Sequence, residues 1–324
     1  MTPRSPSMLR PAFALLVSAL FVFACSKEST VVDQPPPDDT TGTPPETTIT
    51  NPPPPPPPVS FQVVTVAGNI ATCGTAGDEL TAELIDSAPG IVLTAGDNAF
   101  PDGGAQSYQN CYTPTWGRFK SRTWAVLGNH EYDLGNADAA FDYFGDHAGP
   151  RGQGYYSMDL GDWHIIVLND NGGFVPYNSG SAQETWLKAD LAANAKKCVM
   201  ALWHVPYFVS GNQPGYYANP TRKTLWVDLY NGGADVVVNG HQHHYERMAP
   251  MLPDGTADTT GIRQFNVGTG GSSTAAPTVV HPNSQVISTD FGVLRLTLRA
   301  ADYDWQFIPV RGASFTDSGT GTCH

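Results

Sequence analysis

The chain has 324 residues and carries 17 Lys and Arg residues against 30 Asp and Glu residues, for a formal net charge of −13. Binding to a nucleic-acid backbone needs a positive surface, so this acidic balance argues against nucleic acid as a partner. About 260 residues follow a Pro-rich segment, which is enough for one α/β domain with a substantial core.

The N-terminal segment, residues 1–24, contains two arginines followed by an apolar run at 12–24. A run of about 13 residues is too short to span a bilayer and fits the apolar part of a secretory signal peptide. Residues 22–25 read VFAC, which approximates a lipobox and predicts lipidation of Cys25. Cleavage without lipidation is the alternative. We therefore expect an exported protein of the bacterial cell envelope or surface, lipid-anchored at a periplasmic or outer-membrane face.

Residues 25–60 form a Pro-rich segment, with runs of proline at 35–37, 44–45 and 52–58. Polyproline is extended, at about 3.1 Å per residue, and cannot build a core. The composition predicts a disordered stalk that holds a folded domain, residues 61–324, away from a membrane. A PxxP motif for a protein partner is the alternative interpretation.

The folded part alternates short apolar runs, which predict buried strands, with helix-like segments. The predicted strands are 61–67, 91–95, 123–127, 163–168, 198–203 and 234–238. The predicted helices are 78–86, 182–195 and 221–230. Alternating apolar and polar residues at 293–298 and 303–308, around a turn at 300–302, predict a hairpin. Such an order is typical of two packed sheets flanked by helices.

Four of the predicted strands end in side chains of the kinds that bind metals. These strand ends read GDN at 96–98, GNHE at 128–131, WH at 203–204 and NGHQH at 239–243. Carboxylate and amide oxygens together with imidazole suit divalent Zn, Mn or Fe. A single buried His at a strand end is more often structural, but the four motifs together predict a metal site at one rim.

This series resembles the calcineurin-like metallophosphoesterases, and within them the purple acid phosphatase-like branch. The family motifs run GDxG or GDIA, GDxxY, GNH[DE], a strand-end His, and GHxH followed by YER. The chain has GNIA at 68–71, GDNAF at 96–100, GNHE at 128–131, His204, GHQH at 240–243 and YER at 245–247. The resemblance covers nearly all of residues 61–320 and implies an α/β fold, the four-layer αββα sandwich with two mixed sheets flanked by helices.

The resemblance implies two divalent metal ions, Fe, Zn or Mn. The second ion would be held by Asp97, Asn129, His204 and His241, all of which are present. In two-metal members, the Asp at the position of Asp97 bridges the ions. A metal-bound hydroxide then attacks phosphorus.

The ligands of the first ion are incomplete in this chain. Asn69 and Phe100 stand where the family has Asp and Tyr, while Asp97 and His243 are retained. Phe offers no donor, and the amide oxygen of Asn ligates without a charge that would offset the cation. We therefore expect Asn69 to be a weak ligand and the first site to be weak or empty, without a purple ferric centre.

Other residues near these motifs suggest roles toward the substrate. His130 follows a ligand and has no ligand role in the family, so we expect it to contact the phosphoryl group and protonate the leaving oxygen. Glu131 either orients His130 or supports the metal site. His244 either reaches substrate or lies in a solvated loop, and Arg247 either binds phosphate or packs structurally.

Cysteines and aromatic residues leave alternatives open. Four cysteines follow the stalk, namely Cys73, Cys111, Cys198 and Cys323. In an oxidising compartment they predict two disulfides with three possible connectivities, and the lack of CxxC spacing disfavours a Cys-based metal site.

Two long loops carry aromatic residues that either line a cleft or pack the loops, namely Tyr108, Tyr112, Tyr207, Phe208, Tyr216 and Tyr217.

From these features we expect a membrane-anchored, metal-dependent phosphatase that hydrolyses phosphate monoesters. Its partner would be a small-molecule phosphate ester, with no nucleic acid and no obligate protein partner. One alternative is a degenerate single-metal member that acts as an extracellular binding module. The other is a phosphodiesterase.

Overall fold

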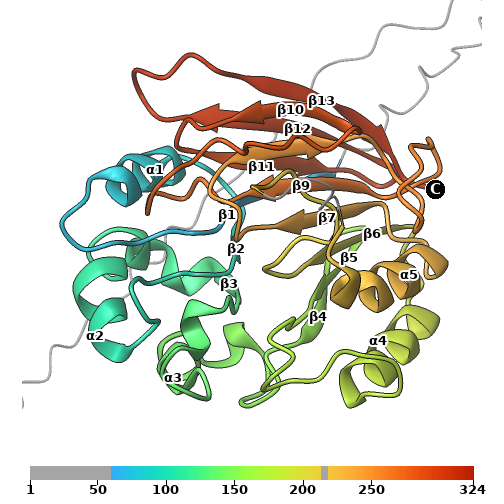
Figure 1. Cartoon of the computed structure of the whole chain (residues 1–324), viewed down its shortest axis with the longest axis horizontal. Coiled ribbons are helices and arrows are strands. Elements are labelled where there is room, and N and C mark those ends of the chain that lie inside the picture. Colours follow the sequence, from blue (N-terminus) through green and yellow to red (C-terminus); the bar gives the residue numbers. More distant parts are fainter. Residues whose placement is uncertain (1–59, 213–217) are drawn as a thin grey trace, which may run out of the picture. The chain divides into compact units, whose positions relative to one another are not determined.

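The computed structural model describes residues 60–212 and 218–324, which belong to one unit of the chain (Figure 1). The predicted signal peptide, Cys25 and the Pro-rich stalk lie outside the described residues, as do Tyr216 and Tyr217. Within the described part, none of the helices combines the length and apolar character needed to cross a membrane.

The first sheet has six strands in the order β13-β12-β11-β1-β2-β3. Its strands are β1 (Gln62–Ala67), β2 (Ile91–Ala95), β3 (Thr123–Val126), β11 (Gly292–Leu298), β12 (Asp302–Pro309) and β13 (Asp317–Thr322). The sheet is mixed, because β1, β2 and β3 pair in parallel while β11, β12 and β13 add antiparallel strands. The predicted hairpin is confirmed as β11 and β12, with Leu298 opposite Tyr303.

The second sheet has seven strands in the order β10-β8-β9-β7-β6-β5-β4. Its strands are β4 (Tyr156–Leu160), β5 (Trp163–Val167), β6 (Cys198–Leu202), β7 (Val236–Asn239), β8 (Tyr245–Met248), β9 (Arg263–Val267) and β10 (Ser284–Ser288). β5, β6, β7 and β9 pair in parallel, and the remaining strands are antiparallel. The predicted strand at 234–238 begins later, at Val236, because Ala234 N–H still bonds to Leu229 O at the end of the preceding helix.

The helices lie outside the two sheets (Figure 1). The α-helices are α1 (Gly77–Asp86), α2 (Ala105–Ser107), α3 (Asp138–Phe144), α4 (Ala182–Ala193) and α5 (Lys223–Asn231). Shorter helical segments are η1 (Tyr108–Tyr112), η2 (Trp116–Arg122), η3 (His130–Tyr132), η4 (Gly145–Ala148) and η5 (Pro220–Arg222). α4 begins where Ser181 Oγ accepts from Glu184 N–H at 3.1 Å, a capping contact that satisfies a free N–H of the first turn.

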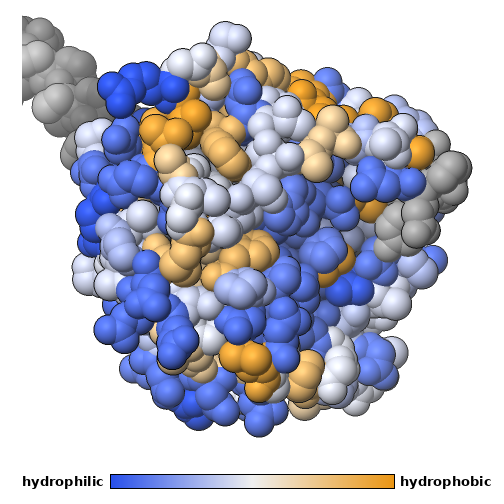
Figure 2. Space-filling view, turned by 60° about the vertical axis from the view of Figure 1, so that its left-hand side comes forward, coloured by the Kyte–Doolittle hydropathy of each residue, from blue (hydrophilic) through white to orange (hydrophobic). Residues whose placement is uncertain are grey.

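Successive side chains of β6 show how the layers pack, because they alternate between two apolar clusters. Cys198, Met200 and Leu202 belong to a cluster that includes residues of the first sheet. Val199 and Ala201 face the other way and pack with residues of α4 and α5. The predicted fold class, two mixed sheets flanked by helices, is therefore confirmed. On the face that Figure 2 displays, apolar residues form small patches among hydrophilic ones.

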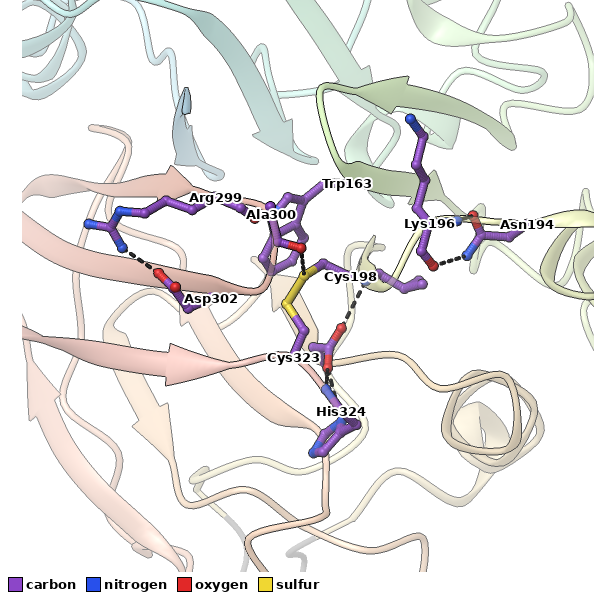
Figure 3. The surroundings of a disulfide bond; sticks show 11 residues. Trp163, Asn194, Lys196, Cys198, Arg299, Ala300, Asp302, Cys323 and His324 are labelled. Atoms are coloured by element: carbon purple, nitrogen blue, oxygen red, sulfur yellow. Dashed lines mark hydrogen bonds and ion pairs between the residues drawn. A yellow bond between two sulfur atoms is a disulfide. The ribbon is translucent and has the colours of Figure 1, made fainter. Parts of the chain in front are cut away.

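Two disulfides pair the four cysteines of the folded part, as Cys73–Cys111 and Cys198–Cys323. Cys198 begins β6 in the second sheet, and Cys323 directly follows β13 in the first sheet, so this bond links the two sheets (Figure 3). Beside it, Trp163 Nε1–H donates to Arg299 O at 2.7 Å. Cross-links that close long loops reduce the entropy of the unfolded chain.

Candidate metal centre

The motif residues follow strands whose carboxyl ends meet at one rim. The loops after β1 and β2 lie side by side, because Asn69 N–H donates to Gly96 O and Ile70 N–H donates to Asp97 O, both at 3.0 Å. Asn69, Asp97 and His241 have positive φ angles of 56°, 52° and 66°. Non-glycine residues hold such a backbone only where surrounding contacts enforce it, as happens at functional sites.

Four predicted ligands of the second ion converge: Asp97, Asn129, His204 and His241. His204 Nε2 lies 3.0 Å from Asp97 Oδ2. His241 Nδ1 lies 3.0 Å from Asn129 Oδ1 and 3.3 Å from His204 Nε2. Donors that each lie about 2.1 Å from one cation are separated by about 3.0–3.4 Å in octahedral or tetrahedral geometry. The spacing and chemistry of this set therefore fit one divalent cation.

Contacts around the set direct its donor atoms. His204 Nδ1 lies 2.7 Å from Ala95 O and donates its proton there, which leaves Nε2 facing Asp97. Two motif glycines make room for the ligands. A Cβ on Gly96 would lie 2.4 Å from His204 Nδ1, and a Cβ on Gly128 would lie 2.2 Å from Asp97 Oδ1.

Burial and charges within the set together shift the pKa values of three of its residues. Burial would raise the pKa of Asp97, but His204 and hydrogen bonds lower it to about 2. Burial would lower the pKa of His204, but the Asp97 carboxylate raises it to about 9. Burial and the positive charge of His204 lower the pKa of His241 to about 3. His241 is therefore neutral, the state in which imidazole binds a metal, whereas His204 would have to give up a proton to bind one.

Glu131 is buried and holds the loops of the site together through both carboxylate oxygens. Oε2 accepts from Asp97 N–H at 3.0 Å and from Gly128 N–H at 2.7 Å. Oε1 accepts from Asn98 N–H at 2.8 Å and from Tyr108 O–H at 3.2 Å. Of the two roles considered for Glu131, support of the metal loops is the one that these contacts favour.

His130 lies beside the candidate metal ligands and is partly exposed. Its Nε2 lies 4.0 Å from Asp97 Oδ2, and its ring centroid lies 4.6 Å from that of Phe100. Its Nδ1 is 2.8 Å from Asp133 Oδ2, so Asp133, which sequence reasoning missed, orients the ring. Asp133 stands three residues after His130, and that spacing, one short helical turn, was the available signal.

The first set of ligands does not fit a cation. Asn69 Oδ1 accepts from His241 N–H at 2.8 Å, which turns Nδ2 toward the other residues of the set. That Nδ2 lies 2.9 Å from His243 Nε2 and 3.5 Å from Asp97 Oδ2. Phe100 presents its ring, 6.1 Å from the His243 ring between centroids. The predicted weak ligand role of Asn69 is therefore not supported, because an amide N–H group faces where the ion would lie.

Two other candidate residues have structural contacts instead. Arg247 binds Asp317 through two nitrogens, at 2.7 and 3.0 Å, and lies over the Trp305 ring. Structural packing is thus the correct alternative for Arg247. His244 is buried with Nε2 3.4 Å from Glu246 Oε2, so both predictions for it, substrate contact and a solvated loop, are wrong.

The aromatic residues of the two loops are mostly packed inside. Tyr108, Tyr112, Tyr207 and Phe208 are all buried and belong to the apolar clusters. Loop packing is therefore the correct interpretation for these four residues.

Asp170 is a further residue that sequence reasoning missed. It accepts from His204 N–H at 3.2 Å and from Val205 N–H at 3.1 Å, and it pairs with Arg222 at 2.9 Å. These contacts hold the loop that carries His204. The position of Asp170 after the apolar run 163–168 was a signal of the same kind as the other strand ends.

Two cavities adjoin the site. One, of about 450 Å³, is lined by polar and apolar residues that include Val205, Asn212, His241 and Gln242. The other, of about 480 Å³, reaches the site at Phe100 and is lined by Pro101, the two cysteines of the Cys73–Cys111 disulfide and polar residues that include Gln106 and Asn110.

Similarity to known proteins agrees with this geometry. Residues 76–245 match the family model of the calcineurin-like phosphoesterases. The chain is 28% identical over 221 residues to purple acid phosphatase 15 of Arabidopsis thaliana, a match that covers 56% of this chain and 41% of that protein. The matched region thus spans less than half of that relative's length.

Solved structures share the fold. A purple acid phosphatase from yellow lupin (Lupinus luteus) seeds has a TM-score of 0.66 at 20% identity, over 82% of this chain and 54% of that one. GAP50, the anchor in the inner membrane complex of Plasmodium, has a TM-score of 0.64 at 15% identity, over 82% of this chain and 89% of that one. Since the family model covers more than half of its length, the chain belongs to the calcineurin-like phosphoesterase family.

Proposed function

We propose that this protein is a metal-dependent phosphoesterase that hydrolyses phosphate monoesters. The observation that carries the proposal is the convergence of Asp97, Asn129, His204 and His241, in which three pairs of donor atoms lie 3.0 to 3.3 Å apart. His130 stands at the edge of this set, where a phosphoryl group bound to a cation would lie within its reach.

A divalent cation held by these four residues supplies positive charge and lowers the pKa of water toward neutrality. The chain provides the remaining functions. His130, oriented by Asp133, donates a hydrogen bond from Nε2 to the phosphoryl group and a proton to the leaving oxygen. Glu131 holds the backbone of Asp97 and Gly128, so that the ligand carboxylate keeps its direction during the reaction.

The size of the adjoining cavities favours a small organic ester. The cavity beside Phe100 and Pro101 suits a leaving group with an apolar part, and the cavity beside His241 and Gln242 suits a more polar one. The formal net charge of −13 disfavours a polyanionic macromolecule. A diffusible phosphate monoester is therefore the substrate that we propose.

Export and anchoring belong to the same proposal. The two disulfides support an oxidising compartment, because such bonds are rare in the cytosol. Residues 22–25, which approximate a lipobox, supply Cys25 as the lipid-bearing residue, and residues 25–60 supply a spacer. Mass spectrometry of the mature protein tests this part: a diacylglyceryl Cys25 at the N-terminus supports the anchor, and an unmodified N-terminus refutes it.

The activity is tested with the purified full chain, stripped of metal and then loaded in turn with Mn, Zn or Fe. We expect release of p-nitrophenol from p-nitrophenyl phosphate, and loss of nearly all turnover in His241→Ala. The partly exposed His324 supplies a matched control, since His324→Ala should keep full activity. Turnover that is independent of metal, or unchanged in His241→Ala, would contradict the proposal. A higher rate on bis(p-nitrophenyl) phosphate would instead identify a phosphodiesterase.

A second candidate function is an extracellular binding module. It is favoured by one observation, namely that the first ligand set presents Asn69 and Phe100, which do not fit a cation. In that case the metal-loaded, folded protein would turn over neither the monoester nor the diester.

A further inference from the structure

The direction of the Asn69 side chain is set by the backbone of a distant segment. His241 N–H points at the side chain from 2.8 Å, and a backbone N–H can only donate. The atom that meets it must therefore be the carbonyl oxygen, Oδ1. Rotating the amide by 180° would place its NH₂ group against this N–H, donor against donor.

The packing around Oδ1 agrees with this assignment. Asn69 is fully buried, and a Cβ placed on Gly240 or on Gly268 would lie only 3.1 Å from Oδ1. Oδ1 is therefore closely packed against backbone at Gly240 and Gly268, where the absence of a side chain leaves space for it. Among non-glycine residues, Asn is also one of those that best tolerate the positive φ of 56° found here.

The opposite end of the amide occupies the place of a cation. Nδ2 points between His243 Nε2, at 2.9 Å, and Asp97 Oδ2, at 3.5 Å, which are the two retained ligands of the first set. His243 is held from its other side, where Nδ1 lies 2.7 Å from Ser273 Oγ and 3.0 Å from Ser273 O; because the carbonyl oxygen can only accept, Nδ1 donates to it. With that tautomer, the Nε2 lone pair is free to accept from Asn69, so the electron pair that would bind a metal is already used.

The first ligand set has lost most of the negative charge that would offset a cation. Relative to the family pattern, Asn for Asp and Phe for Tyr remove two ligands that would each carry a negative charge. A cation added to the present first set would have Asp97 as its one anionic ligand and would lie beside an N–H donor.

We propose that the amide of Asn69 replaces the first metal ion, so that this protein has a mononuclear metal centre held by Asp97, Asn129, His204 and His241. This inference rests on the metal centre of the proposed function. Asp97 then binds one ion instead of bridging two, and Asn69 Nδ2 lies 3.5 Å from the same Oδ2 that faces His204. His243 serves as the acceptor that holds the amide and is not a ligand.

Metal stoichiometry tests the inference independently of catalysis. The full chain without an affinity tag is stripped with chelator, reloaded with excess Mn²⁺, desalted and measured by elemental analysis. We expect one ion per chain, two in Asn69→Asp, and one in His243→Ala. His241→Ala should lose the ion, so any metal that remains in this variant measures adventitious binding. Asp also tolerates a positive φ, so Asn69→Asp changes the metal site with little change to the backbone.

Spectroscopy provides two further measurements, the first of which needs no variant. Mn²⁺ in the natural protein should give the electron paramagnetic resonance spectrum of an isolated ion, without the exchange coupling of a pair. The double variant Asn69→Asp/Phe100→Tyr, loaded with Fe³⁺, should gain a visible tyrosinate-to-iron absorption that the natural chain and Phe100→Tyr alone lack.

Two ions in the natural protein, or a single ion in both Asn69→Asp and the double variant, would overturn the inference while leaving the proposed activity intact. No bound ion in the natural protein would overturn both. Conversely, one ion without turnover would support the mononuclear centre and refute only the proposed activity.

Discussion

Replacement of Glu131 by Gln tests how the loops of the metal centre are held. The substitution keeps the size of a buried side chain and changes only its hydrogen-bonding atoms. In the natural protein, the carboxylate accepts from Asp97 N–H, Gly128 N–H, Asn98 N–H and Tyr108 O–H. A Gln side chain accepts only at its oxygen, and its NH₂ group can only donate.

The side-chain amide of Glu131→Gln can take two orientations, and the four donors around it decide which one loses fewer hydrogen bonds. If the oxygen takes the Oε2 position, it keeps the bonds from Asp97 and Gly128, and the hydroxyl of Tyr108 can turn to accept from the NH₂ group. Only Asn98 N–H then remains buried without an acceptor, at a cost of about 1–3 kcal/mol, and the two retained bonds lose about 1 kcal/mol each with the charge. Burial raises the pKa of Glu131, so relief of a desolvated charge offsets part of this loss. We expect a net destabilisation of about 2–4 kcal/mol.

Guanidinium denaturation of the full chain, with its disulfides intact, measures the free energy of unfolding at pH 7. The partly exposed Glu83, whose carboxylate lies 3.8 Å from Arg311, gives a matched control. Glu83→Gln should change stability by less than about 0.5 kcal/mol. A Glu131→Gln protein with an unchanged midpoint and an unchanged denaturant slope would refute the role of Glu131 as a clamp between loops.

Other contacts give three further predictions. The inter-sheet disulfide joins cysteines 125 residues apart in the sequence, and its removal in Cys198→Ala/Cys323→Ala should lower the free energy of unfolding by about 5 kcal/mol. Denaturation measures this loss, and an unchanged free energy of unfolding would show that the bond adds nothing to the fold. Hydrogen bonds that the His164 ring donates to carboxylates, the one to Asp190 being the largest cause, raise the pKa of His164 above 6.5. The stabilisation that His164 contributes should therefore be complete below pH 6.5 and be lost as the pH rises through the raised pKa. Denaturation midpoints measured from pH 5.5 to 9 should depend less on pH in His164→Gln than in the natural protein. An equal pH dependence in both proteins would contradict this. Asp133→Asn should lower kcat about ten-fold, with KM little changed and the pH profile of kcat displaced, because the His130 ring loses a charged acceptor. An equal loss of kcat at every pH would indicate a merely structural role for Asp133.

Much of the fold was predictable because its central strands are buried on both faces. Continuous apolar runs such as those of β2 and β6 have a single plausible reading in an alternating α/β order. β13 shows the opposite case, since its residues DSGTGT include no apolar side chain. It is a strand because β12 pairs with it and because Gly319 and Gly321 leave space for the rings of Trp305 and Tyr303.

The composition of the metal centre could likewise be read from the chain. Strand-end motifs predicted a metal site at one rim, the family resemblance implied Asp97, Asn129, His204 and His241 as ligands, and the lack of a donor at Phe100 follows from its chemistry in any fold. The structure brings these four predicted ligands together because parallel strands end at the same rim.

Only the tertiary structure decided how the neighbouring polar groups are used. The direction of the Asn69 amide depends on a backbone N–H that lies 172 residues later in the chain. The burial of His244 and the pairing of Arg247 with Asp317 likewise depend on which strands become neighbours. A sequence specifies which atoms can donate or accept, but the partner of each atom is set by segments that meet only when the two sheets pack.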